Sequence, residues 1–234
     1  MHLFFIRHGE SETNANWRPD FKSIEMNSHL TEKGRQQAKG AAEWLHSKVA
    51  KLDGLYASTL IRTRQTVSYF EEAYGMTAEF DDRIREGGYS YANAAPIEDD
   101  LLPVRKYVNF HENPYAAFAA EPNGVESYAD MRQRVGSFLH DLIDRHTAVN
   151  EDGLDTGEQV VALVMHGWTL NAFVDLIFNV PQRRACYVNA ENTSISYFEY
   201  VESKLLGPWR VHFMNITPHI EVFEGGFGYK GEES

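Results

Sequence analysis

Two apolar runs in this chain each lead to a histidine, and these histidines are the first candidates for chemistry. The first run covers residues 3–6, with His8 two positions beyond it; the second covers residues 160–165, with His166 directly after it. Unbroken apolar runs of this length predict strands that are buried on both faces of a parallel sheet. In open α/β sheets, ligands bind beyond the carboxyl ends of the strands. We therefore predict that the two histidines lie in one active site at that edge.

Four further polar residues are predicted to lie at the same edge, and their types indicate what the site binds. They are Arg7, Asn14, Arg62 and Glu86. Two arginines argue against a metal site, because arginine repels cations and the sequence has no spaced cluster of His, Cys and Asp. A phosphoryl group fits better, since a guanidinium fork matches a pair of phosphate oxygens and keeps its charge at any working pH.

Phosphoryl transfer would give each of these groups a role. A neutral imidazole such as His8 can attack phosphorus without a separate base, and water or a second acceptor then discharges the phosphohistidine. Arg7, Arg62 and His166 are the groups that could stabilise the negative charge of the transition state. The leaving alkoxide needs a proton, which Glu86 can supply if phosphate and cover from solvent raise its pKa.

The elements that position these residues follow from local signals. Gly9 and Gly167 follow the two histidines and would let the backbone approach a phosphate. Thr31 is predicted to cap one helix, and Ser58 or Thr59 the helix that carries Arg62. The remaining predicted elements are a strand at 52–57, a helix opened by a capping box of Ser127 and Asp130, a helix after His166, and a terminal strand pair at 195–201 and 209–216.

The segment 87–125 interrupts this alternation of strands and helices. It is rich in proline and aromatic residues, and its only bases are Arg105 and Lys106. Long connections in compact domains are often functional lids, so we interpret it as a cap inserted over the site. The expected organisation is therefore a single domain at 1–224 with this cap-like insertion, followed by a flexible tail at 225–234.

Bulk composition limits the classes of partner. The 234 residues carry a formal net charge of −12, which argues against nucleic acid or an anionic membrane as the main partner. No apolar stretch is long enough to cross a membrane, and the N-terminus shows no secretory signal. The single cysteine, Cys186, cannot form an internal disulfide, which favours the cytoplasm. The sequence leaves the oligomeric state open, a homodimer included.

Six short motifs in the chain resemble, in order, those of the histidine phosphatase superfamily, also called the phosphoglycerate mutase-like family. The motif RHGE…N is similar to residues 7–14, LTxxGxxQA to 30–38, SxxxRTxQT to 58–66, the acid of LRE or LNE to 84–86, VSHG to 164–167, and NTSI to 192–195. The resemblance covers nearly the whole chain. It departs from the family where Met165 replaces the commoner serine, where Trp168 replaces a small residue, and where GxWEG is missing after Glu86.

The resemblance implies a fold and a set of roles. The fold is a three-layer α/β/α sandwich with a mostly parallel central sheet. His8 would be the phosphorylated residue, Arg7, Arg62 and His166 would complete the phosphate pocket, and Glu86 would be the general acid, with no metal or cofactor. The predicted substrate-binding residues are Asn14, Gly9, Ser11, Gly167 and Trp168.

Three functions are compatible with these motifs. We favour a phosphatase that acts on a small phosphorylated substrate, because mutases of this family carry extra bases after the catalytic glutamate and the segment 87–125 is poor in them. A phosphoglycerate mutase is the first alternative, and a non-catalytic phosphate-dependent binding module is the second. The sequence does not name the substrate.

Overall fold

A six-stranded sheet forms the centre of the molecule. The structure, a computed structural model, describes residues 1–16, 24–25, 27–87, 101–102, 126–147, 159–181, 187–201 and 207–220. The strand order is β4-β3-β6-β1-β7-β8, and β2 and β5 pair separately. The strands are β1 His2–Arg7, β2 Ile24–Glu25, β3 Gly54–Ala57, β4 Glu79–Phe80, β5 Leu101–Leu102, β6 Val160–Met165, β7 Ile195–Tyr200 and β8 Trp209–Ile216.

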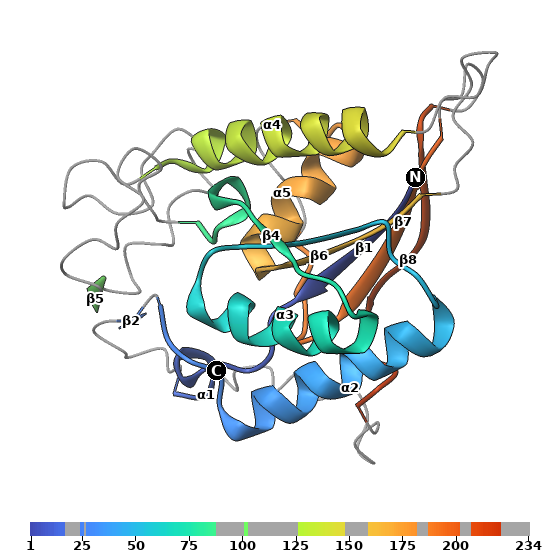
Figure 1. Ribbon diagram of the computed structural model, residues 1–234. Helices are drawn as coiled ribbons and strands as arrows, with labels where there is room; N and C mark the ends of the chain where they lie inside the picture. Colours follow the sequence, from blue (N-terminus) through green and yellow to red (C-terminus); the bar gives the residue numbers. More distant parts are fainter. Residues whose placement is uncertain are drawn as a thin grey trace, which may run out of the picture.

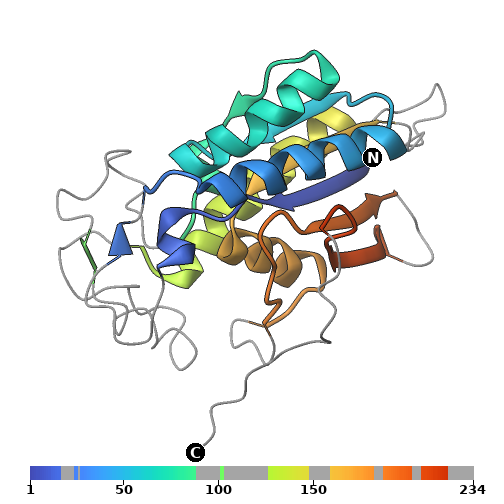
Figure 2. The same cartoon turned by 90° about the horizontal axis from the view of Figure 1, so that it is seen from below.

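Helices cover both faces of this sheet. The α-helices are α1 Glu12–Ala15, α2 Glu32–Lys48, α3 Ile61–Tyr74, α4 Tyr128–His146 and α5 Gly167–Ile177, and η1 Asp82–Ile84 is a single 3₁₀ turn. Helices α4 and α5 lie above the sheet and α2 and α3 below it (Figure 1). Seen from below, α2 runs alongside β1 (Figure 2). The predicted three-layer α/β/α fold is confirmed.

Strand β1 explains why a continuous apolar run is needed at the centre of this sheet. Leu3 and Phe5 pack in the core between the sheet and helices α4 and α5, whereas Phe4 and Ile6 pack in the core between the sheet and helices α2 and α3. Successive side chains of a strand point to opposite faces, so a strand covered on both sides must be apolar at every position.

The direction of the strands sets where the two histidines meet. Strands β4, β3, β6 and β1 are mutually parallel, whereas β7 runs antiparallel to β1. In the β1–β6 pair Arg7 lies opposite Met165, which brings the next residues, His8 and His166, together beyond the same edge. The expected terminal strand pair is also confirmed, since β8 pairs antiparallel with β7.

Two of the predicted helix caps are confirmed and one is wrong. The Thr31 hydroxyl accepts a hydrogen bond from Gly34 N at 3.0 Å, and Ser127 forms the expected capping box with Asp130. Helix α3, however, is capped by Leu60, whose side chain makes no capping bond. The hydroxyl of Ser58 is engaged elsewhere, as described below.

Some expectations fall outside the described residues. These are the tail at 225–234 and most of the aromatic segment 87–125, of which Gly87 and strand β5 are described. Within the described ranges, no helix combines the length and apolar character needed to span a bilayer.

Candidate active site

His8 and His166 form the centre of the candidate site. The backbone N–H of His8 donates to the carbonyl of Met165 at 2.9 Å, which extends the β1–β6 ladder by one residue. The two imidazole rings have centroids 5.1 Å apart and are tilted by 60°. His8 is 2% exposed and His166 is fully buried. Both histidines are therefore held at the sheet edge and shielded from bulk water.

Hydrogen bonds fix the ring orientation of His8. Its Nδ1 lies 2.7 Å from the carbonyl oxygen of Gly9, so this nitrogen carries the proton and donates it. Its Nε2 accepts a hydrogen bond from Arg62 Nε at 3.0 Å. Burial first, and then the charges of Arg62 and Arg7, hold the pKa of His8 well below its usual value. His8 is therefore neutral, with a lone pair on Nε2.

Arg62 is positioned by the first turns of α3. The hydroxyl of Thr66, one turn further on, donates to the Arg62 carbonyl at 2.7 Å and accepts from Gly9 N at 3.1 Å. This hydroxyl ties the helix to the backbone that follows His8, so the guanidinium and the imidazole keep their relative positions.

Arg7 carries the second guanidinium of the site. Its Nη1 donates to the carbonyl of Ala190, and burial lowers the pKa of Arg7, although the nearby Glu86 raises it. Its Nε is buried and has no hydrogen-bond partner within the described ranges. Buried N–H groups are rarely left unsatisfied, so this donor is available to an anion that enters the site.

His166 is oriented by Ser58, one of the two candidate caps of α3. The hydroxyl of Ser58, which follows β3, lies 2.8 Å from His166 Nε2. Burial, followed by the charge of Arg62, holds the pKa of His166 well below its usual value. His166 Nδ1 is buried, and no hydrogen-bond partner for it occurs in the part of the chain that is described.

Glu86 lies two residues after η1 and faces this cluster. Its Oε1 accepts from Gly87 N at 3.1 Å and its Oε2 from Trp168 N at 3.4 Å. Desolvation raises the pKa of Glu86, against the opposing charges of Arg62 and Arg7. The carboxyl group is thus poised to be protonated at a higher pH than an exposed glutamate.

Asn14 is linked to the site through its side-chain oxygen. This oxygen accepts hydrogen bonds from Ser11 N at 3.2 Å and from Asn192 Nδ2 at 3.1 Å. The side-chain NH₂ group of Asn14 is therefore the group that can donate a hydrogen bond to a ligand. Ser11 caps α1, and Asn192 also donates to the His8 carbonyl at 3.1 Å. The structure therefore brings His8, Arg7, Arg62, His166, Glu86 and Asn14 around one place.

The geometry agrees with a comparison to known proteins. The family model described as "Histidine phosphatase superfamily (branch 1)" matches residues 3–217. This chain belongs to the histidine phosphatase superfamily.

Relatives of the chain within the superfamily carry two kinds of name. The chain is 30% identical, over 95% of its length and 96% of the relative's, to "Probable phosphoglycerate mutase GpmB" of Shigella boydii serotype 18. In fold it is similar to a mycobacterial glucosyl-3-phosphoglycerate phosphatase, with a TM-score of 0.67, 22% identity and coverage of 92% and 98% of the two chains. YhfR of Bacillus stearothermophilus gives a TM-score of 0.68 at 23% identity, with coverage of 94% and 99%.

The glycines that follow the two histidines have different surroundings in this chain. A Cβ on Gly9 would lie 2.3 Å from the carbonyl oxygen of Gly34, so the small size of Gly9 allows the N-terminus of α2 to pack against it. A Cβ on Gly167 would lie 3.7 Å from the Tyr187 hydroxyl and 3.8 Å from Arg7 Nε. Gly167 is therefore the one that borders the arginine of the site.

Trp168 contacts Glu86 through its backbone, and its ring packs on other aromatic residues. Its backbone N–H contacts the Glu86 carboxylate, and its ring lies 4.7 Å from the ring of Tyr187, centroid to centroid. From the sequence, Tyr187, Asn192 and Arg134 were not proposed as site residues, and Ser58 was given only a capping role. Ser58 and Asn192 begin two of the superfamily motifs, which was the available signal; Tyr187 had none.

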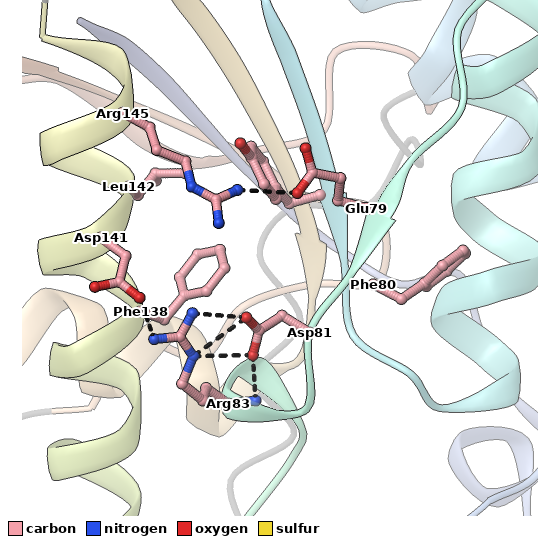
Figure 3. Close-up of a pocket in the computed structure, with 9 residues that line it drawn as sticks. Glu79, Phe80, Asp81, Arg83, Phe138, Asp141, Leu142 and Arg145 are labelled. Carbon is pink, nitrogen blue, oxygen red and sulfur yellow. Dashed lines mark hydrogen bonds and ion pairs between the residues drawn. The ribbon is translucent and has the colours of Figure 1, made fainter.

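A separate pocket lies between β4, η1 and α4 and is drawn in Figure 3. Its lining includes Glu79, Arg83, Phe138 and Asp141 and none of the six site residues named above. Arg83 bridges Asp81 and Asp141 across its floor. In the ranges that are described, no three His, Cys, Asp or Glu side chains are grouped as metal ligands.

Proposed function

We propose that this chain is a phosphomonoester hydrolase that acts through a phosphohistidine on His8 and needs no metal ion. The observation that carries the proposal is the pairing of a buried, neutral imidazole with two arginines, one of which keeps a buried N–H without a partner in the described residues. The two guanidinium groups make this part of the site electropositive. A phosphate group fits there, because its oxygens accept hydrogen bonds from guanidinium groups.

The chemistry follows from these positions. His8 Nε2 attacks phosphorus as Arg62 Nε moves its hydrogen bond from the imidazole to a phosphate oxygen. The bond from phosphorus to the ester oxygen breaks, and the Glu86 carboxyl group gives its proton to that oxygen. Water then attacks the phosphohistidine while the Glu86 carboxylate takes a proton from it, which releases inorganic phosphate and restores His8.

The curated relatives make a phosphoglycerate mutase the second candidate. Relatives about 30% identical carry that name, and a mutase would share the same histidine and arginines. The two differ in the acceptor, since a hydrolase passes the phosphoryl group to water and a mutase to a second hydroxyl of its bound substrate. We favour water because the segment that follows Glu86 is poor in bases that could hold a polyanionic phosphoglycerate. The lone Cys186 supports a reducing compartment, and we place the reaction in the cytoplasm.

The intermediate and the acceptor can be measured in one experiment. The enzyme, with a chelator present, is mixed with a panel of ³²P-labelled phosphomonoesters and quenched within milliseconds. We expect label on the protein that survives alkali and is lost in acid, as a phosphoramidate is, followed by release of inorganic phosphate. Transfer of label between the hydroxyls of phosphoglycerate without phosphate release would establish the mutase instead. Activity that the chelator abolishes would contradict metal independence.

The role of Glu86 predicts an alkaline limb in the pH profile. An alkyl phosphate needs Glu86 protonated, so kcat/KM should fall as pH rises through the pKa of Glu86, which burial places above the ordinary value of 4.5. In Glu86→Gln the rate should be lower and this limb should disappear. A limb of unchanged position in Glu86→Gln would assign it to another group. Glu79→Gln, an exposed acid on β4, serves as the control.

A further inference from the structure

Arg134 of α4 is a buried arginine outside the phosphate site, and its guanidinium is hydrogen-bonded in several directions. Its Nε donates to Glu126 Oε2 at 2.7 Å and its Nη2 to Glu126 Oε1 at 2.5 Å, a two-point contact. The remaining bonds go to backbone carbonyls. Nη1 donates to Arg83 at 2.7 Å and to Arg85 at 2.8 Å, and Nη2 to Glu86 at 3.2 Å.

These bonds converge on the peptide that carries Glu86. The carbonyl of Arg85, the residue before it, also accepts from the Thr169 hydroxyl of α5 at 3.0 Å. Arg134 is 7% exposed and so is Glu126, which lies directly before the capping box of α4. A buried arginine paired in this way holds a defined position, because moving it would leave both a charge and several carbonyls unsatisfied.

The Glu86 carboxyl group needs such support. Its described contacts are the two backbone N–H groups of Gly87 and Trp168, and the second of these is long at 3.4 Å. A general acid must lie within hydrogen-bond reach of the leaving oxygen, and a displacement of about 1 Å can cost about a hundredfold in rate. We propose that Arg134, held by Glu126, is a positioning residue that fixes the Glu86 peptide so that the carboxyl group reaches the leaving oxygen. This inference rests on the proposed role of Glu86.

The arrangement separates this role from phosphate binding. His8, Arg62 and His166 are carried by β1, α3 and the end of β6, and none of their described hydrogen bonds involves Arg134. Loosening the Glu86 peptide should therefore impair protonation of the leaving group and leave attack on phosphorus intact. The effect should depend on the ester, because p-nitrophenolate departs without a proton whereas an alkoxide cannot.

Arg134→Lys is the informative substitution. Lysine keeps the positive charge of Arg134. That charge lowers the pKa of Glu126 and contributes to the low pKa of His166. A single ammonium cannot reproduce the planar fork, and it cannot reach both Glu126 oxygens and three carbonyls at once. We expect kcat/KM for an alkyl phosphate to fall about tenfold to a hundredfold. For p-nitrophenyl phosphate we expect a change of less than about twofold, and the same for the inhibition constant of vanadate.

Asp141→Asn provides the matched control. Asp141 is another α4 residue that ties this helix to η1, through an ion pair between its carboxylate and Arg83 at 2.5 Å (Figure 3). None of the described hydrogen bonds of these two side chains goes to Glu86. If the effect of Arg134→Lys came from general loosening between α4 and η1, this variant would share it. We expect both esters to react with Asp141→Asn as they do with the wild type.

The outcomes separate the possible failures. Equal loss with both esters in Arg134→Lys, or no loss with either, would overturn the positioning role. If Arg134→Lys does not fold, Glu126→Gln, which keeps the shape of the partner and removes its charge, should show the same ester-selective loss in a milder form. In a Glu86→Gln background, Arg134→Lys should add no further selectivity. If Glu86→Gln is itself not selective, the role proposed for Glu86 has failed, independently of Arg134.

Discussion

His8→Ala is expected to release no inorganic phosphate from any ester and to carry no label after the quench. The variant lacks the nucleophile, and no other described group replaces the lone pair that Arg62 contacts at Nε2. Loss of a nucleophile typically lowers kcat by about 10⁴-fold or more. The fold should remain, because the elements on either side of His8 are held by the β1–β6 ladder and the bond from Gly9 N to Thr66.

The control for this variant is His140→Ala. His140 lies on the exposed side of α4, where its side chain is 75% exposed, and it should be replaceable without effect. Turnover in His8→Ala above about a hundredth of the wild-type rate would rule out the phosphohistidine. A binding module would behave differently, with no turnover in the wild type and unchanged phosphate binding in the variant.

Arg62→Met is expected to lower kcat/KM by about 10³-fold, the range seen when one charge that faces the transferred phosphoryl group is removed. Protonation of His8 should give the pH profile an acid limb, and Arg62→Met should shift that limb. The charge of Arg62 is one of the causes that lower the pKa of His8, so its removal raises that pKa and moves the limb to higher pH. Burial is the larger cause and persists, so the limb should stay below 6.5.

Arg64→Met is the matched control for Arg62→Met. Arg64 lies two residues further along α3, where its guanidinium packs over the exposed ring of Phe80 at 4.1 Å from the centroid. Its removal changes the charge of the chain equally but leaves the site alone. A similar fall in rate or a similar shift of the acid limb in Arg64→Met would show that long-range charge, rather than contact with phosphate, is responsible.

The central strands and the two histidines could be predicted from the sequence because their signals are local. A run buried on both faces has to be apolar throughout, as residues 3–6 and 160–165 are, and parallel strands place their carboxyl ends at one edge. The helix signals were local too, since the hydroxyls of Thr31 and Ser127 bond to the backbone three residues away.

Other features depend on contacts between distant segments, which no local pattern records. Ser58 precedes a helix as a cap would, yet its hydroxyl lies against His166, 108 residues away. Arg134 resembles any polar residue of an amphipathic helix, and only the folded chain brings it to the carbonyl of Glu86. The space available at Gly9 also depends on a distant segment, since it is limited by the carbonyl of Gly34 in helix α2.

The guanidinium of Arg134 has a consequence for how this chain can vary. It joins the carbonyls of Arg85 and Glu86, which lie just before the segment 87–125, to the carboxylate of Glu126, which lies directly after it. The ends of the segment are thus clamped at a separation that does not depend on what lies between them. The entropy of closing such a loop grows slowly, by about 0.6 kcal/mol for each doubling of its length. Grafts of different length and composition should therefore be tolerated there, which would let selection for the leaving group proceed separately from selection for the phosphoryl chemistry.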